Sequence, residues 1–164
     1  MNKDANVSQS GELRVFAMAA SNYGDSMIHA CISASHACDE AVQSANGFMK
    51  TAMEREEAAR QTRDEAEEAY QQYEATNRPQ SDDNKYDSAV AARLRNAAEE
   101  AKTRYYEAVA TRERVQGLND TVRSEAFTLQ GTLAVAQSRI SQAASTAYQQ
   151  VNSAASLIDN YNQI

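Results

Sequence analysis

The side chains best suited to chemistry lie in two short, similar segments. His29 and Cys31 stand two residues apart, and His36 and Cys38 repeat that spacing seven residues later. Imidazole nitrogens and thiolates are ligands that zinc prefers. On a helix, however, residues two apart point about 200° away from each other. We therefore predict structural cysteines on a buried face and histidines on the surface, and a metal site between two chains stays open as an alternative.

Other patterns that catalysis or redox chemistry would need are missing from the sequence. Cys31 and Cys38 would lie about 10 Å apart along a helix, too far for a mutual disulfide. The carboxylate pairs Glu56–Glu57 and Glu67–Glu68 have no histidine nearby. The sequence has no glycine-rich phosphate loop, nucleophile elbow or Cys-x-x-Cys motif. We expect no enzymatic activity, no catalytic residue, no metal and no cofactor.

The composition indicates a helical protein. The chain has 164 residues, of which 31 are alanine, and a single proline at Pro79. Alanine is the best helix former, and proline the strongest helix breaker. Thinly apolar sequences of this kind suit long helices joined along narrow rows of contact better than a thick core. We expect one domain at this length.

Charge and hydropathy bear on the kind of partner. The net charge is −7, and lysine and arginine do not cluster, which argues against binding to nucleic acid or anionic lipid. No stretch approaches the roughly 20 apolar residues of a membrane span. Residues 1–12 are polar and lack the apolar core of a signal peptide. We expect cytoplasmic synthesis, and export without a cleaved signal peptide stays open.

Both halves of the chain carry seven-residue repeats, which are typical of helices that pack along a seam. In the N-terminal half the rows are Ile28, Ser35, Val42, Met49, Glu56, Arg63, Tyr70 and Cys31, Cys38, Ala45, Ala52, Ala59, Ala66, Tyr73. In the C-terminal half they are Leu94, Ala101, Ala108, Val115, Val122, Leu129, Ala136, Ala143 and Ala98, Tyr105, Arg112, Asn119, Ala126, Leu133, Ile140, Ala147, Ala154, Tyr161. The sequence therefore predicts an all-α fold, a long antiparallel helical hairpin or coiled coil.

Proline and polar residues near the middle of the chain set the expected helix boundaries. Pro79 disfavours helix at the preceding residue, and the polar residues that follow it can cap a new helix. We predict a single helical domain, residues 1–164, made of an N-terminal segment with a short helix that ends at Ser21–Asp25 (1–24), a first long helix (25–76), a turn (77–85) and a second long helix (86–161). Tyr70, Tyr73 and Tyr86 flank this turn and are expected to close it by aromatic packing.

Two glycines leave an alternative architecture open. Gly47 and Gly117 lie at similar distances from the turn, so both arms could bend or break there. The hairpin would then fold into a four-helix bundle.

The end of the hairpin that holds the termini has few charges. Between residues 126 and 164 the only ones are Arg139 and Asp159. Small uncharged faces can dock on another helix at little desolvation cost. We interpret this end as an interface with a helical partner or a second copy, and burial within the monomer is the alternative. The predicted interface and seam residues are Ile28, Cys31, Cys38, Val42, Ala45, Met49, Leu129, Leu133, Ala136, Ile140, Ala143, Ala147, Val151 and Leu157.

The predicted architecture, with Leu13-Arg14-Val15-Phe16-Ala17 opening the first helix, resembles helical-hairpin proteins of bacterial type VII secretion: the Trp-x-Gly class and the helical partners of LXG toxins. Tyr70-Gln71-Gln72-Tyr73-Glu74 matches the Tyr-x-x-x-Asp/Glu pattern of that family, although it lies beside the turn. The chain has no tryptophan, so the Trp-x-Gly turn is absent. The resemblance implies a secreted partner or adaptor that pairs with another helical protein.

Three functions are compatible with this sequence. The first is a non-enzymatic helical interaction module, a partner or adaptor in a secretion or toxin system. The second is a subunit of a helical filament or appendage, of the type III needle or flagellin kind. The third is a small metal-binding helical bundle.

Overall fold

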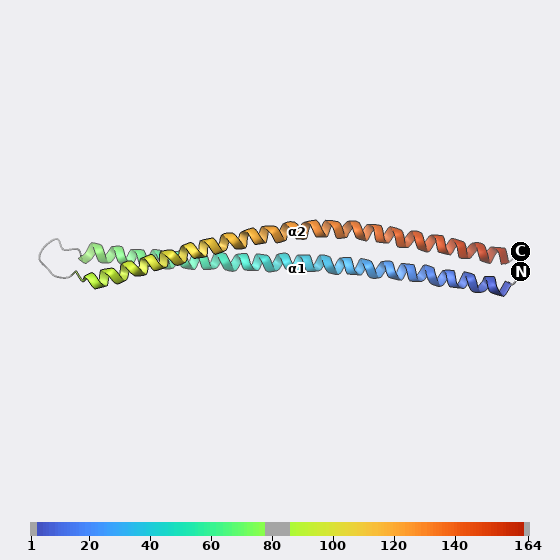
Figure 1. Cartoon of the computed structure of the whole chain (residues 1–164), viewed down its shortest axis with the longest axis horizontal. Helices are drawn as coiled ribbons and strands as arrows, with labels where there is room; N and C mark the ends of the chain where they lie inside the picture. The colour runs from blue at the N-terminus through green and yellow to red at the C-terminus, as the bar shows by residue number, and fades with distance from the viewer. Residues whose placement is uncertain (1–2, 78–85, 163–164) are drawn as a thin grey trace. The chain divides into compact units, whose positions relative to one another are not determined.

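The chain folds into two helices in the computed structural model, which describes residues 3–77 and 86–162. Helix α1 spans Lys3–Asn77 and helix α2 spans Ser88–Asn162, each with 75 residues (Figure 1). No strand occurs in these described ranges. The structure confirms the all-α helical hairpin that the heptad rows predict.

The hairpin divides into two compact units. Unit 1 contains Met1–Ala41 and Ser124–Ile164, and unit 2 contains Val42–Arg123. In unit 1 the two helices run antiparallel, because Arg14 contacts Asp159 and Asp39 contacts Gln130. Each unit therefore joins one stretch of α1 to one stretch of α2.

Both helices continue through the positions where the sequence suggests interruptions. Helix α1 passes through Ser21–Asp25 and Gly47, and α2 passes through Gly117. The predicted short N-terminal helix and the four-helix alternative are therefore wrong, and the first long helix begins at Lys3 instead of residue 25. A lone glycine weakens a helix by only about 1 kcal/mol, which flanking helix-forming residues can offset. Most of the predicted turn, 78–85, lies outside the described residues.

Tyr73 and Asp87 organise the start of α2 in unit 2. The Asp87 Oδ1 atom accepts hydrogen bonds from the backbone N–H groups of Ala89 and Val90, at 2.8 and 3.3 Å. This is N-terminal capping, which satisfies donors that the first helical turn leaves free. The Tyr73 hydroxyl accepts from the Asp87 N–H at 2.9 Å and donates to the Asp87 carbonyl at 3.0 Å. The Tyr73 and Tyr86 ring centroids lie 6.1 Å apart, as the sequence predicts for this pair.

The core of each unit is a narrow seam of small side chains. The buried apolar residues among those described are Ala17, Cys38, Ala52, Ala91, Ala101, Ala126 and Ala155. Within the described ranges, no large side chain is fully buried. Short side chains allow two helices to approach closely, so this seam is held by proximity of the helices more than by bulky apolar packing.

Candidate interaction surface

The structure places most of the predicted interface and seam residues on the contact between α1 and α2 inside their unit. Cys38 is buried. Ten others are half-buried: Ile28, Cys31, Val42, Ala45, Met49, Leu133, Ala136, Ile140, Ala147 and Val151. The row that contains Cys31 also extends further than predicted, because Ser10, Ala17 and Gly24 precede it at seven-residue spacing and are all buried.

Three predicted residues on α2 do not belong to the seam. Leu129, Ala143 and Leu157 are exposed, Leu129 by 47% and Leu157 by 71%. The cause is a change in spacing after Val122, where the next inward positions come four residues apart, at Ala126 and Gln130. Such an insertion shifts the frame of a heptad repeat, so rows extrapolated past it point beside the seam. As seam residues these three predictions are wrong, and as interface residues they stay predictions.

Gly24 marks a close approach of the two helices in unit 1. A Cβ atom at position 24 would lie 2.6 Å from the Cβ of Ala144. That separation is too short for two carbon atoms, so only glycine fits beside Ala144 at this helix spacing. The residue that resembles a helix stop in the sequence is thus a packing position.

A polar cluster ties the two helices together near the termini. The Arg14 guanidinium donates to Oδ2 of Asp159 at 2.6 Å. A hydrogen bond from the Ser10 side chain, followed by the one from Arg14, lowers the pKa of Asp159. Two of the few charges in unit 1 are therefore paired with each other across the seam.

A second row of apolar residues runs along α1 in unit 1, beside the seam. Each member directly precedes a seam-row position, and the members are spaced three or four apart, so they form one face. Phe16 and Tyr23 are 70% and 68% exposed, and Met27 is 39% exposed. We call this face the outer stripe: Leu13, Phe16, Ala20, Tyr23, Met27, Ala30, Ala34, Ala37 and Ala41. It contains no polar or charged residue.

The other side of the seam on α1 carries both polar and apolar residues, because Val15 and Ile32 are exposed there by 67% and 40%. Asn22, His29, His36 and Asp39 all lie there and are exposed. Apolar side chains therefore flank the seam of α1 on both sides, but only the outer stripe is free of charged residues.

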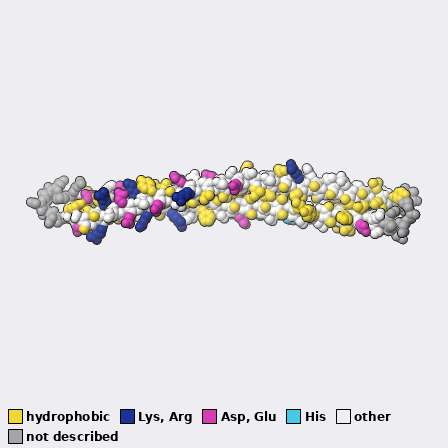
Figure 2. Space-filling model, in the orientation of Figure 1, with side chains coloured by type: hydrophobic (Ala, Val, Ile, Leu, Met, Phe, Trp, Pro, Cys, Tyr) yellow, Lys and Arg dark blue, Asp and Glu magenta, His cyan; other side chains and the backbone are white. Residues whose placement is uncertain are grey.

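Helix α2 also exposes apolar side chains in unit 1. Phe127 is 79% exposed and Val135 is 52% exposed. They line an open groove of about 770 Å³ together with Gly131, Ala136 and Ile140. On the face drawn in Figure 2, hydrophobic side chains predominate over unit 1 and charged ones are sparse. Single exposed apolar residues are ordinary, but a continuous patch is typical of an interaction site.

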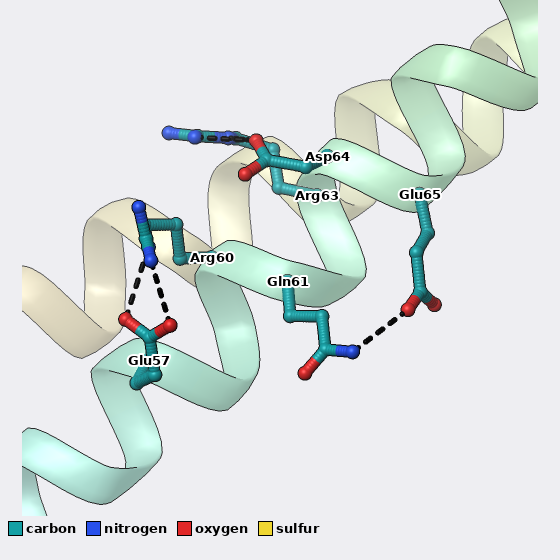
Figure 3. A network of polar contacts seen from close by, with 6 residues as sticks. All are labelled: Glu57, Arg60, Gln61, Arg63, Asp64 and Glu65. Carbon is teal, nitrogen blue, oxygen red and sulfur yellow. Dashed lines mark hydrogen bonds and ion pairs between the residues drawn. The ribbon is translucent and has the colours of Figure 1, made fainter.

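Unit 2 has the opposite surface. Residues 42–123 hold 29 charged side chains, whereas the equally long remainder of the chain holds ten. The Arg60 guanidinium donates to both carboxylate oxygens of Glu57, at 3.0 and 2.7 Å, and Gln61 donates to Glu65 at 3.1 Å (Figure 3). The hydrogen bond from Arg60 lowers the pKa of Glu57. These contacts lie along one helix and keep its outer face solvated.

Charge also enters the seam in unit 2. The Arg112 Nε atom donates to Oε2 of Glu56 at 2.7 Å, from α2 to α1, and both side chains are about one-quarter exposed. The guanidinium carbon of Arg63 lies 4.3 Å from the centroid of the Tyr105 ring, a cation–π contact across the same seam. Both units thus combine small buried residues with an ion pair across the seam, and unit 2 adds a cation–π contact and a far more charged surface.

The histidines and cysteines are arranged as the sequence predicts. Cys38 is buried and Cys31 half-buried on the seam, while His29 and His36 are exposed on the side of the seam opposite the outer stripe. No group of three His, Cys, Asp or Glu side chains that could hold a metal ion occurs among the described residues. Neither helix has a described segment long and apolar enough to cross a membrane.

The outer stripe was missed by the sequence analysis, although its spacing is visible there. It runs one position ahead of the seam row from Leu13 to Ala41, and the glycine at position 24 led us to end a helix in its middle. A search for two rows offset by one residue would have found it. Compared with protein families, curated proteins and solved structures, the chain matches none of them.

Proposed function

We propose that this chain is a non-enzymatic protein–protein interaction module that docks on a helical surface through the outer stripe of unit 1. The observation that carries the proposal is the stripe itself, an uncharged face with Phe16 and Tyr23 about 70% exposed. Burying exposed aromatic side chains is a main source of binding free energy at interfaces. The alanines between them would allow close approach of another helix.

A role as partner or adaptor in a bacterial secretion or toxin system agrees with this proposal. Its support is the resemblance to helical-hairpin proteins of type VII secretion, which act as pairs of helical proteins. The charged outer surface of unit 2 would keep that part of the molecule in water. The partner would then meet unit 1 only.

Capture from cells that encode the protein, with covalent cross-linking, tests the proposal. Ala37→Glu places a charge in the outer stripe, and Ala58→Glu makes the same change at the same heptad position in unit 2; both alanines are exposed. We expect wild type and Ala58→Glu to recover the same helical protein, and Ala37→Glu to lose it. Equal recovery with Ala37→Glu would contradict the proposal.

A filament or appendage subunit is the second candidate. The observation in its favour is the low charge and the abundance of alanine, serine and glutamine in both helices of unit 1. Light scattering separates the two functions. A filament subunit forms polymers that grow with concentration, whereas an interaction module reaches a fixed size.

A further inference from the structure

The outer stripe has large residues toward its N-terminal end and small ones toward its C-terminal end. This asymmetry of size restricts what can cover it. Its N-terminal part holds the large side chains Leu13, Phe16, Tyr23 and Met27. Its C-terminal part, Ala30–Ala41, holds only alanine at the stripe positions. Large residues need small ones opposite them if two helix faces are to fit at constant spacing. A complementary partner must therefore present small residues first and large residues last.

The stripe of a second copy meets this requirement when it runs in the opposite direction. We propose that two copies pair through their outer stripes as antiparallel helices, with the two-fold axis between Ile28 and His29. This inference rests on the proposed function and names its partner as the chain itself. The layers then join Phe16 with Ala41, Ala20 with Ala37, Tyr23 with Ala34, and Met27 with Ala30 of the second copy.

The heptad spacing is consistent with this register. Along the stripe, the steps between neighbouring residues alternate between three and four positions. In the antiparallel register, each residue that begins a three-residue step meets one that begins a four-residue step. This is the alternation by which antiparallel helices interdigitate. A parallel arrangement would instead place Tyr23 on Tyr23 and Ala34 on Ala34, with overcrowding at one end and a gap at the other. Packing therefore selects the antiparallel pair.

Charge and size also favour the pair. The stripes are uncharged, and Glu40 beside the stripe comes level with Ala17 of the second copy and not with another acid. The overlap, from Leu13 to Ser44, corresponds to about 48 Å of helix. With the flanking side chains, each copy contributes about 20 residues, the size of a stable interface.

Exchanging the two residues of one layer, Tyr23 and Ala34, tests the register directly. Sedimentation of the purified full chain gives the dimer dissociation constant. Tyr23→Ala should raise it at least about tenfold, because two buried aromatic contacts are lost per dimer. Adding Ala34→Tyr should restore it, since the same two side chains then meet with their positions exchanged. Adding Ala41→Tyr instead, a mismatched control, should not restore it.

Spin labels provide a measurement that is independent of affinity. Labels are placed singly at Ser26→Cys or Glu40→Cys, both exposed beside the stripe, in a chain carrying Cys31→Ala and Cys38→Ala. The antiparallel pair predicts labels within about 20 Å at position 26 and separated by about 35 Å along the helices at position 40. Short distances at both positions would indicate a parallel pair and overturn the register.

The outcomes distinguish this inference from the proposed function. A wild-type chain that sediments as a monomer at every concentration overturns self-pairing. Rescue by Ala41→Tyr as effective as rescue by Ala34→Tyr does so as well. If self-pairing fails in this way while Ala37→Glu still abolishes capture of a different helical protein, the interaction module stands with another partner.

Discussion

Units 1 and 2 both join α1 to α2, but they differ in the surface beside the seam. In unit 1 Gly24 packs closely against Ala144, and the outer stripe beside the seam is apolar. In unit 2 the Glu56–Arg112 ion pair and the Arg63–Tyr105 contact cross the seam, and the surface is charged. The comparison teaches that one hairpin can join its helices in a similar way along its length and still carry two different surfaces. Ion pairs cross the seam in both units, while the outer surface is densely charged in unit 2 and sparsely charged in unit 1.

The largest change in stability is expected where Gly24 packs against Ala144. Gly24→Ala should lower the free energy of unfolding by about 1–2 kcal/mol, because the added methyl group overlaps Ala144 and the helices must separate. Gly47→Ala, in unit 2, should raise it by about 0.5–1 kcal/mol, because nothing lies within 4 Å of the new Cβ and alanine favours helix. Chemical denaturation followed by circular dichroism measures both.

The double variant Gly24→Ala with Ala144→Gly controls for local effects of the substitution. If crowding is the cause, the two changes should interact favourably when combined. Additive losses would mean that Gly24 is not held against Ala144.

The ion pair in unit 2 should give the next largest effect. Glu56→Ala removes the hydrogen-bonded carboxylate of Arg112 from a partly buried seam and leaves only its longer contact to Glu113, which costs more than losing an exposed pair. The melting temperature should therefore fall further than in Glu57→Ala, whose pair with Arg60 lies on the outer surface. Equal melting temperatures would show that the stability of unit 2 does not depend on this polar pair between its helices.

Acid should weaken the terminal end of unit 1 through Asp159. The pKa of this carboxyl is lowered in the folded state by Ser10 and Arg14, so its contribution to stability is present above its unfolded pKa of about 4. That contribution is lost as the pH falls through the folded-state pKa. Melting curves of wild type and Asp159→Asn should therefore differ at pH 7 and converge once the pH falls below the lowered folded-state pKa of Asp159. A difference that persists at low pH would rule out this linkage.

The smallest effect is expected on the outer surface of unit 2. Arg60→Gln removes the donor that lowers the pKa of Glu57, so that pKa should return toward its usual value in a carboxyl NMR titration. The melting temperature should hardly change, because the pair is exposed. A drop as large as that of Glu56→Ala would erase the distinction between seam and surface pairs.

The sequence predicted the helical hairpin and most of its seam, because the seven-residue repeat of small residues is regular along α1. The prediction failed where the same residue type can play two structural roles. Gly24 indicates a helix end when neighbouring residues are considered alone, and its packing role depends on Ala144, 120 positions away. On α2, Leu129 and Ala143 were assigned to the seam because the change of frame after Val122 is not visible in the sequence. Alanine stands both on the seam and beside it, so the heptad row looks unbroken.

The uniform alanines of the seam have a consequence for how the protein reaches its fold. Ala45, Ala52, Ala59 and Ala66 are equivalent, so a slide of α2 by seven residues leaves an alanine at each of these positions and is opposed by contacts such as Glu56–Arg112. The tyrosine contact to Asp87 spans 14 residues, whereas the Arg14–Asp159 contact spans 145. Short loops close at a lower entropic cost. We expect α1 and α2 to pair first near their central connection and then toward their ends. The contact between Tyr73 and Asp87 would set the alignment before the interchangeable alanines meet.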